Sequence, residues 1–131
     1  MRILLDTHVA LWAIAKTTRL PAEIAGFIVD PANAVVVSAV SVWEIAIKHA
    51  LSRGGADDIA ISGARALTHF HEAGYELLSV SAEHAAAVER LPRLHGDPFD
   101  RLLVAQALSE PLRLITHDTT MAAYSDTVIW F

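Results

Sequence analysis

Acidic residues stand where the chain is expected to pass from strand to helix. Asp6, Glu44 and Asp118 each follow an apolar run typical of a strand, and Asp100 lies in the string His95-Gly-Asp-Pro-Phe-Asp-Arg101. In a parallel α/β sheet such turns gather at the carboxyl ends of the strands, where ligands bind. Four acids converging there would repel one another unless a divalent cation lay between them. We therefore expect a metal-dependent phosphodiesterase site.

The donor chemistry indicates which metal such a site would hold. The chain has no cysteine, so thiolate ligands are excluded and hard carboxylate oxygens remain. Such a set suits Mg²⁺ or Mn²⁺ better than Zn²⁺. A cation of this kind activates water and stabilises the leaving oxygen of a phosphodiester, so no side-chain nucleophile is needed.

Aromatic and histidine side chains provide weaker signals. No pair of histidines has the spacing of a zinc site on one helix. His95 and His117 are expected to lie closest to the acids, where they could contact a substrate. Trp12, Trp43 and Trp130 are expected to be core or interface anchors, with base stacking as the alternative. No glycine-rich phosphate loop is present.

Each acid also has a purely structural interpretation. Asp6 and Asp118 are good N-cap residues for the helices that follow them. Ser41 and Glu44 have the spacing of a capping box, in which Ser41 caps a helix and Glu44 reaches back to its backbone N–H.

A helix start is also expected within the string from His95 to Arg101. Asp97 is the expected N-cap, Pro98 the first helical residue, and Asp100 an acid in the first turn. In this arrangement we expect Asp100 to point into the crevice at the carboxyl ends of the strands. Arg101 is expected either to contact a phosphate or to neutralise the acids.

Strands and helices are expected to alternate along the chain. Strands are predicted at residues 2–5, 34–38, 77–80, 113–116 and 127–131. Helices are predicted at 7–16, 21–30, 41–52, 62–73, 82–91, 98–108 and 119–123, with a loop at 53–58. This order predicts an α/β fold whose mostly parallel sheet of about five strands carries helices on both faces.

The composition limits the class of protein. With 131 residues, 53% of them hydrophobic and 19% charged, the chain is expected to form a single domain spanning residues 1–131. The net charge of −5 excludes a generally basic nucleic-acid binder. No apolar run reaches the length of a membrane span and no signal peptide is expected, so we predict a cytoplasmic protein that does not contact membranes.

Four motifs together resemble a known family. Leu4–His8, Ser38–Ile45, His95–Ala107 and Leu114–Asp118 are similar to the PIN-domain ribonucleases. The segment from His95 to Arg101 resembles the toxin branch of VapBC toxin–antitoxin modules. The matches run from the first predicted strand almost to the last residue.

The resemblance implies a three-layer α/β/α fold and an endoribonuclease that depends on Mg²⁺ or Mn²⁺. It implies that the acidic site is formed by Asp6, Glu44, Asp100 and Asp118. It also implies that Asp97 is an auxiliary acid and that the Thr116 hydroxyl supports the site. It further implies an RNA substrate, a homodimer, and an antitoxin protein that covers the site.

One mechanism and two alternatives follow. We expect Asp6 and Asp100 to hold the principal metal, with Glu44 and Asp118 completing its shell. A catalytically silent interaction module with the same fold is the first alternative. A phosphatase of the haloacid-dehalogenase kind is the second, but it normally needs an acid two residues after the first aspartate, where this chain has His8.

Overall fold

A five-stranded parallel sheet forms the centre of the molecule. The computed structural model describes residues 1–15, 17–56 and 58–131. The strands are β1 (Arg2–Leu5), β2 (Ala34–Ser38), β3 (Glu76–Leu78), β4 (Arg113–Thr116) and β5 (Ile129–Trp130). Their order is β3-β2-β1-β4-β5, and all four pairings are parallel. The chain therefore builds outward from β1 in one direction and later returns to its other side, which leaves a crevice at the carboxyl ends of β1 and β4.

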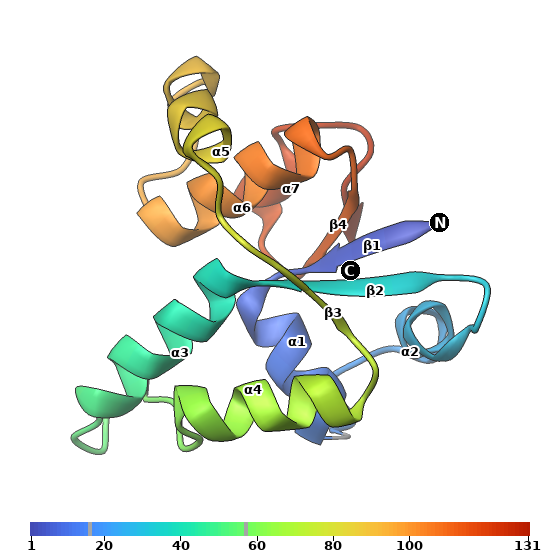
Figure 1. Ribbon diagram of the computed structural model, residues 1–131, viewed down its shortest axis with the longest axis vertical. Helices are drawn as coiled ribbons and strands as arrows, with labels where there is room; N and C mark the ends of the chain where they lie inside the picture. Colours follow the sequence, from blue (N-terminus) through green and yellow to red (C-terminus); the bar gives the residue numbers. More distant parts are fainter. Residues whose placement is uncertain (16, 57) are drawn as a thin grey trace.

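Helices cover both faces of this sheet (Figure 1). They are α1 (Thr7–Ala15), α2 (Ala22–Val29), α3 (Ala39–Ala50), α4 (Gly63–Glu72), α5 (Ala82–Ala87), η1 (Val88–Arg90), α6 (Pro98–Ser109) and α7 (Thr119–Ala122). Helices α1 to α4 contribute to the core on one side of the sheet, whereas α5, α6 and α7 contribute mainly to the core on the other. The predicted three-layer α/β/α arrangement is confirmed.

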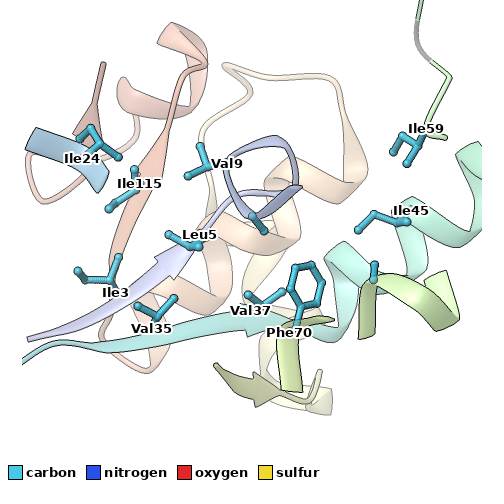
Figure 2. Packing of buried hydrophobic residues seen from close by; sticks show 12 residues of the cluster. Ile3, Leu5, Val9, Ile24, Val35, Val37, Ile45, Ile59, Phe70 and Ile115 are labelled. Atoms are coloured by element: carbon cyan, nitrogen blue, oxygen red, sulfur yellow. The ribbon is translucent and has the colours of Figure 1, made fainter. Parts of the chain in front are cut away.

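Alternation along the strands divides the core in two, because successive side chains of a strand point to opposite faces. Ile3 and Leu5 join one cluster together with Val37 and Phe70 (Figure 2). Leu4, which lies between them in sequence, joins the other cluster. These side chains are buried on both faces of the sheet, as expected for parallel strands covered by helices.

Some element boundaries differ from those predicted. The predicted helix start at Ser41 is wrong, because α3 begins at Ala39 and Ser38 is its N-cap, accepting a hydrogen bond from the Val40 N–H at 3.0 Å. The predicted end of the first helix at Lys16, and Asp57 in the predicted loop, lie outside the described residues.

Within the described part of the chain, no helix combines the length and apolar character needed to cross a membrane.

Candidate active site

Five carboxylates line one pocket, which lies just beyond the ends of β1 and β4 and includes residues from the interior of α3 and the start of α6. They belong to Asp6, Glu44, Asp97, Asp100 and Asp118. Among the described residues of this lining, the only lysine or arginine is Lys48. If all these groups were ionised, the pocket would carry four more negative than positive charges, an excess that a bound cation would offset.

Asp6 is both a helix cap and part of the pocket. Its Oδ1 accepts a hydrogen bond from the Val9 N–H at 2.9 Å, which satisfies the start of α1, and its Oδ2 accepts one from the Thr116 hydroxyl. Burial raises the pKa of Asp6, while the hydrogen bonds from Thr116 and Val9 oppose this rise. The capping and site interpretations of this residue are therefore compatible, because the carboxylate has two oxygens.

Asp118 divides its oxygens in the same way. Oδ1 caps α7 by accepting from the Thr120 and Met121 N–H groups at 2.7 and 3.1 Å, and Oδ2 lies 3.0 Å from His95 Nε2. Burial opposes ionisation, but the hydrogen bonds from His95, Met121 and Thr120 lower the pKa of Asp118 below its usual value. The Thr116 hydroxyl, which donates to Asp6, also accepts from the Asp118 N–H at 3.0 Å.

Glu44 does not form the predicted capping box. Because α3 starts at Ala39, both Ser41 and Glu44 lie inside the helix and are buried. Glu44 Oε1 accepts from the Thr7 hydroxyl at 2.6 Å, and Oε2 forms an ion pair with Lys48 Nζ at 2.6 Å. These two partners hold the carboxylate in a fixed orientation at the pocket wall.

The start of α6 is built as predicted. Asp97 Oδ1 accepts from the Phe99 and Asp100 N–H groups at 2.8 and 3.3 Å, and Pro98 is the first helical residue. Asp100 lines the pocket. Burial raises the pKa of Asp100 to about 7, and the negative charges of Asp97 and Glu44 add to this rise.

His95, one of the two histidines expected near the acids, lies between Asp100 and Asp118. Its Nδ1 lies 3.0 Å from the Asp97 backbone nitrogen, which can only donate, so the ring proton is on Nε2. Nε2 donates to Asp118 Oδ2 and lies 3.1 Å from Asp100 Oδ2. A metal-ligating histidine normally donates its other ring N–H, so this arrangement favours a role in orienting the two carboxylates.

Arg101 is not brought to the acids. Its guanidinium donates to the carbonyl oxygens of Pro92 and Val88, both at 3.1 Å, and to the Tyr124 hydroxyl at 3.2 Å. The expected contact with a phosphate or with the acid cluster therefore has no support in the geometry. Arg101 instead fastens the segment after α5 to helix α6.

The pocket fits a hard divalent cation. Single carboxylate oxygens of Asp100 and Asp118 lie within 4.8 Å of one another, with His95 Nε2 beside both. Asp6 and Glu44 add further oxygens to the same pocket, and their negative charges raise the pKa of Asp100. Carboxylate oxygens are the donors that Mg²⁺ and Mn²⁺ prefer.

The rest of the pocket lining includes aromatic rings to which the resemblance to the PIN-domain ribonucleases gave no role. His8, Trp12 and His117 line the same pocket as the acids. Trp43 and Trp130, in contrast, are outside this lining and expose more than half of their surfaces. The spacing of His8 and Trp12, four residues apart on a predicted helix, could have indicated a shared face.

Known proteins share both the sequence pattern and the fold. The family described as PIN domain matches residues 3–126. Ribonuclease VapC22 from Mycobacterium tuberculosis (strain ATCC 25618 / H37Rv) is 32% identical over 123 residues, which cover 93% of this chain and 91% of that protein.

Two solved structures illustrate the likeness in fold. One is VapBC2 from Rickettsia felis bound to a DNA fragment from their promoter, with a TM-score of 0.68, 18% identity, and coverage of 100% of this chain and 98% of that chain. The other is VapBC-5 from Mycobacterium tuberculosis, with a TM-score of 0.62, 21% identity, and coverage of 99% and 97%.

Proposed function

This chain belongs to the PIN-domain family, and from that premise we propose that it is a Mg²⁺- or Mn²⁺-dependent endoribonuclease, the toxin of a type II toxin–antitoxin pair. The observation that carries the proposal is the set of five carboxylates in one pocket at the carboxyl edge of the sheet. The similarity to a protein named as a VapC ribonuclease supports the same reaction class.

In this proposal Asp6 and Asp100 hold the principal cation, and Glu44 and Asp118 complete its surroundings. When bound, such a cation supplies an activated water and stabilises the charge on the leaving oxygen of a phosphodiester.

Neighbouring side chains hold these acids in place. The Thr116 hydroxyl orients Asp6, and His95 holds Asp118 close to Asp100. Glu44, held by Thr7 and Lys48, keeps free lone pairs with which to orient a water.

The proposed partners follow from the same pocket. RNA is the substrate, and the chain acts in the cytoplasm as a homodimer. The antitoxin is a protein that places a basic side chain among the acids, because an ammonium or guanidinium group offsets the excess negative charge described above. The structural neighbours described as VapBC complexes support an antitoxin partner.

Cleavage of a mixed RNA pool by the purified protein tests the proposal. We expect cuts with Mg²⁺ or Mn²⁺ that disappear in EDTA and in the Asp6→Asn and Asp100→Asn variants, which remain folded. Asp126→Asn, which removes a carboxylate outside the pocket, serves as the matched control and should cleave like the wild type. Cleavage by Asp6→Asn at the wild-type rate with the same metal dependence would contradict the assignment.

The two alternatives predict different outcomes. A silent interaction module would cleave no RNA at any metal concentration. A phosphatase of the haloacid-dehalogenase kind would become covalently labelled at Asp6 during turnover. His8, which occupies the position where that class needs its second acid, lines the pocket with an imidazole instead.

A further inference from the structure

An aromatic wall, defined by His8, Trp12 and His117, forms part of the pocket that also contains the acids. His8 and Trp12 are one turn apart on α1, with ring centroids 6.2 Å apart. The Trp12 and His117 centroids are 5.9 Å apart in an edge-on arrangement. His8 and His117 are exposed, and Trp12 is half-buried, so the wall presents ring surface directly beside the acids.

The wall is held by the packing behind it. The His117 ring lies 4.9 Å from the Phe131 ring and makes a short contact through Nδ1 to the Phe131 backbone oxygen. Trp12 packs edge-on against the same Phe131 ring at 6.3 Å and contacts the core cluster that contains Ile3 and Leu5. Rings fixed in this way lose little further freedom when a flat ligand stacks on them.

A positive charge adjoins the wall. The Arg19 guanidinium carbon lies 5.5 Å from the centroid of the Trp12 ring, within the range of a cation–π contact. A second depression in the surface shares His8 and Trp12 with the acidic pocket and is lined by Arg19 and by the apolar side chain of Ile61. The surface therefore continues from the acids, across the aromatic wall, to a cation.

We propose that the aromatic wall binds an unpaired base of the RNA next to the phosphate that is cleaved, with Arg19 beside a neighbouring phosphate. The inference rests on the proposed ribonuclease function and identifies the surface of this chain that holds the base beside the cut. Bases in a duplex are already stacked and paired, whereas an unpaired base can turn its flat face onto aromatic side chains. In a chain of net charge −5, a cation beside this wall favours an anionic strand along this path.

A change in the substrate alone gives the first test. Once a cut has been mapped in a single-stranded RNA, each nucleotide flanking the cut is replaced in turn by an abasic ribonucleotide. We expect one of these substrates to raise KM by about 5- to 150-fold, the loss of one base stack. The same RNA annealed to its complementary strand should be cleaved far more slowly. Equal KM values for the intact and all abasic substrates would overturn the proposal.

Variants of the wall give the second test. Trp12→Leu keeps apolar packing toward the core, and His8→Ala changes an exposed side chain. Both should raise KM by a similar factor while kcat stays within about two-fold, because ground-state and transition-state binding are lost together. Trp130→Leu, which changes an exposed tryptophan outside the pocket, should leave both constants unchanged. Wild-type KM values for both wall variants would overturn the proposal.

A binding measurement separates this proposal from the proposed reaction. In the Asp100→Asn background with Mg²⁺, fluorescence anisotropy of a labelled single-stranded RNA should report binding that weakens when Trp12→Leu is added. If the wild type cleaves no RNA but this loss of affinity is observed, base binding by the aromatic wall is supported and the proposed nuclease activity is contradicted. If the wild type cleaves RNA but affinity is unchanged by Trp12→Leu, the nuclease stands and the wall is not a base-binding surface.

Discussion

His95 Nε2 lies 3.0 Å from Asp118 Oδ2, and this hydrogen bond joins the loop before α6 to the start of α7. The same nitrogen lies 3.1 Å from Asp100 Oδ2. One imidazole nitrogen thus lies beside the carboxylates of both Asp100 and Asp118, which 17 residues separate in the sequence. Orienting groups of this kind tune metal affinity even when they do not contact the metal.

Removal of the His95 ring should therefore weaken metal binding. We expect His95→Ala to remain folded, and to lower Mn²⁺ affinity and RNA cleavage by about 10- to 100-fold. Isothermal titration with Mn²⁺ measures the first quantity directly. His71→Ala, an exposed change on α4, is the control. Unchanged Mn²⁺ affinity in His95→Ala would show that the acids hold their positions without the imidazole.

Stability in the absence of metal should fall as pH rises through the range in which Asp100 ionises. Burial and neighbouring charges raise the pKa of Asp100 to about 7 in the folded state. The native state then binds more protons than the unfolded state between about pH 4 and 7, so the free energy of unfolding decreases across this window. The pKa of Asp6 is also raised and acts in the same direction.

Metal should reverse this trend, because it binds the ionised carboxylates. We expect the increase in Tm caused by Mn²⁺ to grow from pH 6 to pH 8, as measured by thermal unfolding with Mn²⁺ or with EDTA. Asp100→Asn should flatten the pH dependence of the metal-free protein. A Tm increase that is the same at both pH values would contradict the link between Asp100 and the metal.

Ser38 and Gln106 connect the helices that carry Glu44 and Asp100. The Ser38 hydroxyl caps α3 and donates to Gln106 Oε1 at 2.5 Å, and both side chains are fully buried. Ser38→Ala removes a cap and leaves a buried amide oxygen unpaired, so it should lower the free energy of unfolding by about 2–4 kcal/mol. Urea denaturation measures this change. Ser109→Ala, an exposed serine at the end of α6, should change stability by less than about 0.5 kcal/mol.

Gly63 and Gly26 should respond in opposite ways to the same substitution. A Cβ on Gly63 would lie 2.9 Å from Ala46 Cβ and 3.2 Å from the Val42 carbonyl oxygen, where α4 approaches α3. Gly63→Ala should therefore destabilise the protein by about 1–3 kcal/mol. Gly26, inside α2, has open space around the added carbon, so Gly26→Ala should stabilise by about 0.5–1 kcal/mol. Denaturant midpoints compare the two, and equal shifts would contradict the close approach of α3 and α4.

Local chemistry was sufficient to predict the layers and the position of the acids. The β-branched run Val35–Val37 and the apolar segment Ile3–Leu5 indicate strands that are buried on both faces, whatever surrounds them. Asp97 and Pro98 specify a helix start through their own backbone preferences. Parallel pairing then brings the strand ends to one edge, so the gathering of Asp6 and the other acids follows from topology.

Contacts between distant segments decided where α3 starts and where the Glu44 and Arg101 side chains point, which the sequence pattern could not predict. The start of α3 depends on Ser38, which Gln106 holds from a helix 68 residues further along the chain. This start turns Glu44 toward Thr7 and Lys48 instead of toward a capping box. Arg101 turns to backbone carbonyls that only the folded chain presents.

The partner of the His95 ring and the aromatic wall also belong to the tertiary structure. The Asp97 N–H, two residues away, leaves the ring proton on Nε2, but only the docking of α7 brings Asp118 to that proton. Trp12 and His117, which are distant in sequence, meet beside the acids. Sequence patterns report preferences within a few residues, whereas the direction of a polar side chain depends on which partner the whole fold brings within hydrogen-bonding distance.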